Sequence, residues 1–128
     1  MKLSIIIPVF NEEGSLRALH HQITDSIKMF EEYEIIFIDD GSSDESKLII
    51  QNMIEKDSRV KLISFFRNFG KSAALSEGFK YASGDIIITM DADLQDDPNE
   101  IPALISKLNE GFDLVSGWKK KRYDPWTK

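Results

Sequence analysis

The stretch Leu3-Ser4-Ile5-Ile6-Ile7-Pro8-Val9 decides the fold class of this chain. It is short and rich in β-branched residues, as is typical of a strand that is covered on both faces. An amphipathic stretch follows, and its apolar residues are spaced by three and four, which predicts a helix. These are Leu16, Leu19, Ile23, Ile27 and Phe30.

The same alternation continues along the chain. Further strands are predicted at Glu34–Ile38, Val60–Phe65, Asp85–Met90 and Asp113–Ser116. Helices are predicted between them, after a capping-box pattern at Ser42 and Glu45, over Lys71–Ala82, and from Asp97-Pro98 to Gly111. This order predicts an α/β fold, a Rossmann-like three-layer α/β/α domain with a mostly parallel sheet.

Composition narrows the classes of function. The chain has 128 residues, 16 Lys and Arg, 22 Asp and Glu, and a net charge of −6, which argues against a nucleic-acid partner. It has no cysteine, which excludes disulfides and thiolate metal sites. The apolar run Ile5–Phe10 is too short to span a membrane, so we expect a soluble, cytoplasmic type of protein.

Acidic residues gather where strands end. Because ligands of open α/β sheets bind beyond the carboxyl ends of strands, these junctions are the candidate site. Asp91 and Asp93 directly follow an apolar strand with one residue between them, and we predict that they bind a hard divalent cation. Asp44, Asp96 and Asp97 are predicted to be helix caps and turn residues instead.

Several familiar motifs are excluded. No G-x-G-x-x-G follows the first strand, so the dinucleotide-binding fingerprint is absent. Gly70-Lys71-Ser72 matches the end of a P-loop, but Phe65 stands where its first glycine is needed. The run from Asp91 fails as an EF-hand, because Asp96 and Pro102 occupy positions that need glycine and glutamate.

Four motifs occur in order along the chain: Ile5–Glu13, Ile38–Asp44, Arg67–Lys71 and Met90–Pro98. Together they resemble glycosyltransferase family 2. More narrowly, they resemble its dolichyl-phosphate mannose synthase-like or polyprenyl-phosphate glycosyltransferase branch, for which Asp-Ala-Asp-Leu-Gln-Asp-x-Pro is typical. The resemblance implies a GT-A fold and metal-dependent, inverting transfer of a sugar from a nucleotide-diphospho-sugar to an acceptor, with a polyprenyl phosphate as the expected acceptor.

The resemblance also implies a nucleotide-binding set. Pro8, Phe10 and Glu12 would border the base and ribose of a UDP-, GDP- or dTDP-linked sugar. Asp40 would accept a hydrogen bond from the base, and Asp39 would support the turn. For Phe10, packing in the core is an equally open interpretation.

The diphosphate and metal set is implied in the same way. Lys71 would lie near the diphosphate, and Asp91 belongs to both the nucleotide-binding and the metal-binding set. Asp91 and Asp93 match the D-x-D of the family, and Gln95 matches its third polar position. Together these three would hold Mg²⁺ or Mn²⁺ against the leaving group.

The chain departs from the family pattern at its end. We expect residues 1–117 to be the nucleotide-sugar-binding part and residues 118–128 to begin a missing acceptor-binding half, which would carry the catalytic base. The chain alone is therefore expected to bind without turnover, and the exposed face would favour a homo-oligomer. The basic, Trp-flanked segment 118–126 suits either a membrane surface at the cytoplasmic face or a solvated loop.

Two other functions are open at this point. One is a non-catalytic module that binds sugar nucleotides. The other is a receiver-type phosphoacceptor domain, which has a similar length and alternation but carries its acidic pair after the first strand. Here the acidic pair Asp39-Asp40 follows the second strand. A lipid phosphate and a glycan are both open as the acceptor.

Overall fold

The computed structural model describes residues 2–109. The predicted strand Asp113–Ser116, the segment 118–126 and the predicted division at residue 117 lie outside the described residues. None of the helices in residues 2–109 combines the length and the apolar character that a membrane span needs.

Among the described residues, four parallel strands form the sheet. They are β1 (Lys2–Val9), β2 (Glu32–Asp39), β3 (Val60–Ser64) and β4 (Ile86–Thr89), in the order β3-β2-β1-β4. Since β1 pairs on both sides and is covered on both faces, Leu3, Ile5 and Ile7 are fully buried. The apolar run that opened the sequence therefore forms an inner strand of the sheet, as predicted.

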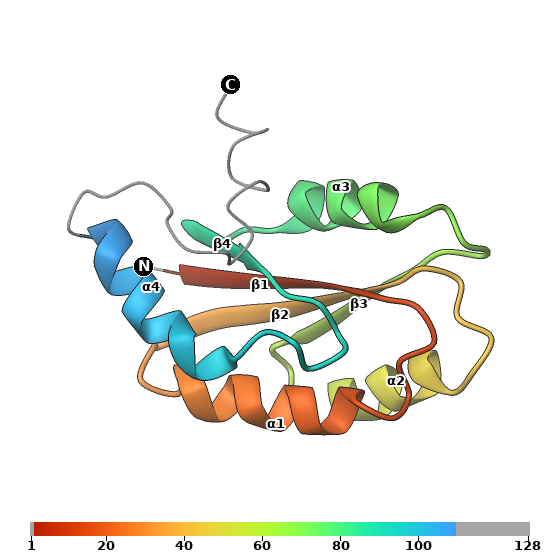
Figure 1. Ribbon diagram of the computed structural model, residues 1–128, viewed down its shortest axis with the longest axis horizontal. Helices are drawn as coiled ribbons and strands as arrows, with labels where there is room; N and C mark the ends of the chain where they lie inside the picture. Colours follow the sequence, from red (N-terminus) through yellow and green to blue (C-terminus); the bar gives the residue numbers. More distant parts are fainter. Residues whose placement is uncertain (1, 110–128) are drawn as a thin grey trace.

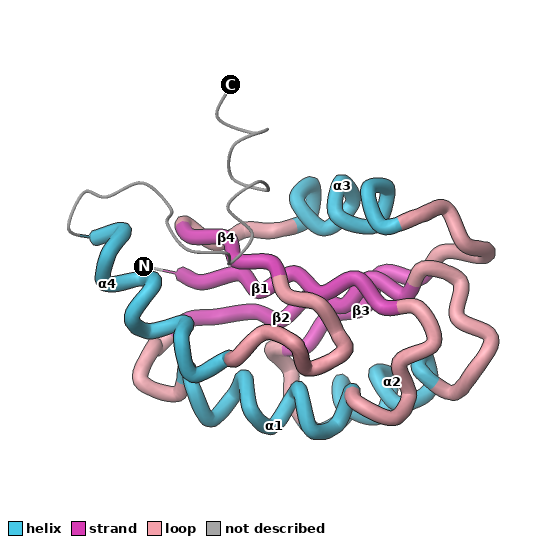
Figure 2. Tube along the Cα trace, viewed as in Figure 1, coloured by secondary structure: helices cyan, strands magenta, loops and turns pink. Residues whose placement is uncertain are grey.

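Helices cover both faces of the sheet (Figure 1), and the tube in Figure 2 shows the same three layers. The helices α1 (Leu16–Ile27) and α2 (Ser46–Lys56) lie on one face, and α3 (Lys71–Tyr81) lies on the other. A single 3₁₀ turn, η1 (Pro98–Glu100), leads into α4 (Ile101–Asn109), which packs against α1. The predicted three-layer α/β/α class is confirmed.

The two faces of β1 supply two cores. Ile5 and Ile7 pack in the larger core, under α1 and α2. Ile6 packs with Ala74 of α3 in the smaller core. At Gly78 of α3 an added Cβ would lie 2.5 Å from Cγ2 of Ile6, so the absence of a side chain there lets α3 lie close to the sheet.

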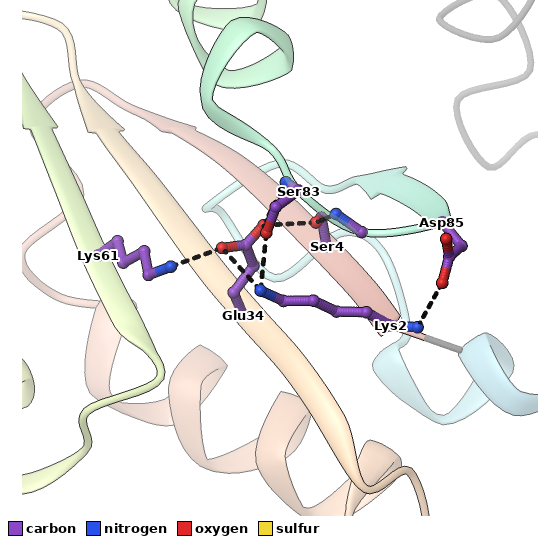
Figure 3. Close-up of polar contacts among 7 residues, drawn as sticks. Lys2, Ser4, Glu34, Lys61, Ser83 and Asp85 are labelled. Atoms are coloured by element: carbon purple, nitrogen blue, oxygen red, sulfur yellow. Dashed lines mark hydrogen bonds and ion pairs between the residues drawn. The ribbon is translucent and has the colours of Figure 1, made fainter.

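A buried carboxylate joins the strands at the amino edge of the sheet (Figure 3). Glu34 of β2 is 1% exposed, and it accepts hydrogen bonds from Nζ of Lys61 at 2.8 Å and from Oγ of Ser4 at 2.7 Å. The backbone N–H of Ser83 donates to the same carboxylate at 2.7 Å. Glu34 thus connects β1, β2, β3 and the turn before β4 at the edge opposite the predicted site.

One predicted helix start is wrong. Helix α2 begins at Ser46, whose backbone N–H donates to Oδ1 of Asp44 at 2.9 Å. The predicted cap, Ser42, instead accepts a hydrogen bond from the N–H of Asn11 at 2.9 Å. The Ser42–Glu45 capping box does not form because Ser42 serves a contact between two loops.

The strand order predicts where a ligand-binding crevice lies. The chain builds β1, β2 and β3 outward and then returns to the other side of β1 to form β4. In open α/β sheets, a reversal of this kind leaves a crevice outside the carboxyl ends of the two strands that flank it. Here those strands are β1 and β4, which end at Val9 and Thr89.

Candidate functional site

A pocket of about 270 Å³ lies at the carboxyl ends of β1 and β4. Seven of the nine residues predicted for nucleotide and metal binding line it: Pro8, Phe10, Glu12, Asp40, Lys71, Asp91 and Asp93. The other two, Asp39 and Gln95, are not among its lining residues. Residues at the end of β1, after β2, at the start of α3 and after β4 therefore bring most of the predicted set into one cavity.

Asn11 shapes the loop that follows β1, and sequence reasoning gave it no role. Its backbone adopts a φ of 54°, a left-handed conformation that asparagine tolerates better than most residues. Its side-chain Oδ1 accepts hydrogen bonds from the backbone N–H of Ser43 at 2.8 Å and of Asp44 at 3.3 Å. Asn11 thereby joins the loops after β1 and β2, which both contribute to the pocket.

Asp40 organises the loop between β3 and α3. It is 4% exposed, and its carboxylate accepts hydrogen bonds from the backbone N–H of Phe69 at 2.7 Å and of Gly70 at 3.0 Å. The side-chain amide of Asn68 donates to it at 3.1 Å. Asp40 therefore lines the pocket while it holds the loop that leads to Lys71, and Asn68 is a second residue that sequence reasoning did not assign.

Gly41 allows that loop to approach. Its φ is +75°, and an added Cβ would lie 2.5 Å from the backbone nitrogen of Asn68 and would overlap the carbonyl carbon of Arg67. Backbone atoms cannot move aside as a flexible side chain can. The glycine of the Asp-Asp-Gly-Ser motif is thus required by a contact between two main chains.

Asp39 does not line the pocket. It is 2% exposed, and its Oδ1 is buried without a hydrogen-bond partner in the described structure. A buried polar atom of this kind is costly and uncommon in folded proteins. Its backbone carbonyl accepts the N–H of Phe65 at 2.9 Å, so the main chain of Asp39 extends the pairing of β2 with β3.

The loop after β4 forms a tight acidic turn. The backbone N–H of Asp91 donates to Oδ2 of Asp96 at 3.1 Å, and that of Gln95 donates to Oδ1 of Asp93 at 3.2 Å. Between them, Leu94 has a φ of 66°, which is unusual for a branched apolar residue. Asp96 thus acts as a turn residue, as predicted, while Asp91 and Asp93 both face the pocket.

The turn and cap roles predicted for two other acids are also confirmed. Asp97 caps η1 through a hydrogen bond from the N–H of Asn99 at 3.0 Å. Asp44 accepts the N–H of Glu13 at 3.2 Å, in addition to its contact at the start of α2.

Negative charge dominates the pocket. Among the described residues that line it, four are acidic and one, Lys71, is basic. Burial raises the pKa of Glu12 above its ordinary value. The negative charges of Asp93, Asp44 and Asp91 raise that pKa further, so the field at this point favours a cation.

The donor set fits Mg²⁺ or Mn²⁺. Among residues 2–109, no group of three or more His, Cys, Asp or Glu side chains is arranged to hold a metal ion. The pocket instead offers two carboxylates, from Asp91 and Asp93. Mg²⁺ binds in this way to nucleotide sites, with one or two carboxylates and with phosphate and water oxygens completing its shell.

Comparison with known proteins assigns the family. Residues 4–128 match the model of glycosyl transferase family 2. The chain belongs to this family. The resemblance of the four motifs is thereby confirmed, and each of the four contributes at least one residue to the lining of the pocket.

Relatives of this family 2 chain are longer. Undecaprenyl-phosphate 4-deoxy-4-formamido-L-arabinose transferase from Proteus mirabilis is 44% identical over 129 residues. That match covers 99% of this chain but 40% of the relative, so the chain spans about two fifths of the length of this curated protein.

Solved structures share the fold. S. aureus TarS 1-349 superposes with a TM-score of 0.67 at 21% identity, covering 86% of this chain and 33% of TarS. Glucosyl-3-phosphoglycerate synthase from Mycobacterium tuberculosis, in complex with Mn²⁺, UDP and phosphoglyceric acid, gives 0.68 at 23% identity, covering 91% and 40%. Mannosyltransferase PcManGT from Pyrobaculum calidifontis, with GDP-Man and Mn²⁺, gives 0.63 at 21% identity, covering 79% and 30%. The GT-A type of fold is confirmed by these likenesses.

Proposed function

We propose that this chain is the donor-binding part of a family 2 glycosyltransferase that transfers a sugar from a nucleotide-diphospho-sugar to a polyprenyl phosphate. The observation that carries the proposal is the pocket at the β1–β4 crevice, which gathers seven of the nine predicted residues. Residues 1–117 would form this part. The acceptor half and the catalytic base would belong to sequence beyond it, at the cytoplasmic face of a membrane.

The relatives support both substrates. The name of the Proteus mirabilis relative specifies an undecaprenyl phosphate, which is a lipid-phosphate acceptor. Two structural neighbours contain Mn²⁺ together with UDP or GDP-Man. A nucleotide donor, a divalent cation and a lipid phosphate are therefore the substrate and cofactor classes we propose here.

The pocket residues have distinct tasks in this proposal. Pro8, Phe10 and Glu12 would border the nucleoside, and Asp40 would meet the base while it holds the loop before α3. Asp91 and Asp93, with Gln95, would hold Mg²⁺ or Mn²⁺, which neutralises charge on the departing diphosphate.

The reaction itself is an inverting displacement. An oxygen of the acceptor attacks the anomeric carbon of the sugar, and the bond from that carbon to the nucleoside diphosphate breaks. With a phosphate as the acceptor, orientation matters more than removal of a proton. We propose that the 128-residue chain binds the donor without turnover.

A thermal-shift screen tests the proposal. UDP-, GDP- and dTDP-sugars are each added with and without Mn²⁺, and we expect one nucleotide to raise the melting temperature only when the metal is present. Asp93→Ala should abolish the shift. Asp25→Ala, at an exposed residue of α1 that pairs with Lys28 at 3.2 Å, is the matched control and should retain it. Failure of every nucleotide to stabilise the wild-type chain with metal would overturn the proposal.

A further inference from the structure

Lys71 and Asp91 form an ion pair inside the pocket. Nζ of Lys71 lies 2.6 Å from Oδ1 of Asp91, across 20 positions of sequence. Lys71 is the first residue of α3, and Asp91 follows β4, so the pair bridges the start of α3 and the loop after β4. The ammonium therefore already contacts a carboxylate that is predicted to bind the metal.

We infer that the ammonium group of Lys71 stays paired with the carboxylate of Asp91, where the metal would bind, until the metal-bound nucleotide arrives. The ammonium then moves from this carboxylate to the diphosphate. The inference rests on the proposed function. It assigns Lys71 two opposite effects, since the side chain competes with free metal but supports the complex of metal and nucleotide.

Little free energy is lost when Lys71 leaves Asp91. The Lys71 side chain is 52% exposed, and ion pairs with this degree of exposure contribute little to stability. Its flexible four-carbon stem lets the ammonium turn to a new acceptor without any change in the backbone. A diphosphate beside Asp91 would offer oxygens in place of the carboxylate that the metal takes.

The charges that line the pocket favour this exchange only when the metal arrives together with a diphosphate. Lys71 is the one basic residue among the described residues that line a pocket with four acidic ones. A free metal ion that enters must displace the ammonium or bear its repulsion. A metal ion that arrives with a diphosphate brings a partner for the ammonium, so neither charge is left uncompensated.

The consequence is a coupling between two ligands. Metal and nucleotide should each bind more tightly in the presence of the other, and the two enhancements must be equal. A lysine that is only a phosphate ligand would leave the affinity for free metal unchanged when it is removed. A lysine that is only a structural ion pair would leave the nucleotide unaffected.

Mn²⁺ titration measures both effects on the 128-residue chain. Binding of Mn²⁺ is followed by loss of the electron paramagnetic resonance signal of the free ion, first alone and then with the nucleoside diphosphate selected by the screen. Lys71→Met removes the charge and retains the length of the side chain, and Lys71→Arg retains the charge. Lys80→Met, which breaks an exposed pair with Glu77 near the other end of α3, is the matched control.

We expect Lys71→Met to bind free Mn²⁺ about two- to fivefold more tightly. It should bind the nucleotide in the presence of Mn²⁺ about tenfold or more weakly, through loss of a charge-assisted hydrogen bond. Lys71→Arg should stay near the wild type, and Lys80→Met should change neither affinity.

Two results separate the failures. If wild-type protein binds Mn²⁺ and nucleotide together, but Lys71→Met does not strengthen the binding of free Mn²⁺, the exchange is wrong and the proposed function stands. If the wild-type chain binds no nucleotide with Mn²⁺, the proposed function and the exchange both fail.

Discussion

The carboxylate of Asp40 accepts a hydrogen bond from the backbone N–H of Gly70 at 3.0 Å, and this contact ties the end of β2 to the start of α3. The same carboxylate accepts the N–H of Phe69. The position of Lys71, one residue further along, therefore depends on a side chain that lies 30 positions earlier in the sequence than Gly70.

Asp40→Ala should destabilise the fold. The N–H groups of Phe69 and Gly70 would lose their acceptor, at a cost of about 2 to 4 kcal/mol in the free energy of unfolding. Urea denaturation measures the change. Asp25→Ala, at an exposed position, should stay within about 0.5 kcal/mol of wild type. An Asp40→Ala protein as stable as wild type would show that the loop does not need this anchor.

Gly41→Ala should be more harmful than a surface glycine substitution. The new Cβ would clash with the main chain at Arg67 and Asn68, and alanine would be forced into a left-handed backbone conformation. We therefore expect the free energy of unfolding to fall by about 3 kcal/mol and nucleotide binding to weaken. Gly14→Ala, where nothing lies within 4 Å of the added atom, serves as the control. Equal melting temperatures for the two variants would contradict the close approach.

Glu34→Gln should remove a stabilising charge whose effect depends on pH. Burial alone would raise the pKa of Glu34, but hydrogen bonds from Lys61, Ser83 and Ser4 outweigh burial and lower it from 4.5 to about 2. The folded state thus binds a proton less readily than the unfolded chain. The contribution, about 3 kcal/mol, is present above pH 4.5 and is lost as the pH falls toward 2.

The free energies of unfolding of wild type and Glu34→Gln at several pH values check this prediction. The two proteins should differ by about 3 kcal/mol at pH 7, and the difference should shrink as the pH falls below 4.5. A difference that is constant over this range would mean that the charge of Glu34 contributes nothing.

Glu12→Gln should stabilise the protein at neutral pH. Burial, with the charges of Asp93, Asp44 and Asp91, raises the pKa of Glu12, so the ionised side chain opposes folding at pH 7. The glutamine removes that cost. The increase in melting temperature should disappear below pH 4.5, where the unfolded chain also carries the proton. Glu31→Gln, at an exposed position outside the pocket, should show no increase.

Binding of Mn²⁺ with nucleotide should raise the melting temperature of wild type more than that of Glu12→Gln. A bound cation offsets the repulsion at Glu12, so wild type should gain more from ligand than Glu12→Gln does. Differential scanning fluorimetry with and without ligand measures the two gains, and an equal gain would argue against a cation near Glu12.

Local patterns predicted the elements because their causes are local. The β-branched run of β1 and the spacing of apolar residues in α1 each reflect burial of one segment, and both elements formed as predicted. The strand β4 ends at Thr89, one residue before the predicted end at Met90, although Met90 is buried and its N–H still donates to the carbonyl of Ile6 at 3.0 Å.

Local sequence patterns did not predict the contacts between loops. The spacing of Ser42 and Glu45 is typical of a capping box. The hydroxyl of Ser42 instead accepts a hydrogen bond from the N–H of Asn11, 31 positions earlier. The orphaned oxygen of Asp39 and the pairing of Lys71 with Asp91 likewise depend on how the loops pack over the sheet. The sequence could predict which residues gather at the pocket, but not which of them bind one another there.

The strand order has a consequence for how the chain refolds. The hydroxyl of Ser4 and the carboxylate of Glu34 are 30 positions apart, whereas the contact of Lys2 with Asp85 closes 83 positions. Pairing of β4 with β1 therefore carries the larger loop-closure cost, and we expect it to form last. The loop that carries Asp91 and Asp93 reaches the crevice only with this pairing. A partly folded chain that contains β1 to β3 has no complete pocket. Nucleotide and metal should accordingly slow unfolding of the finished protein and leave its rate of refolding unchanged.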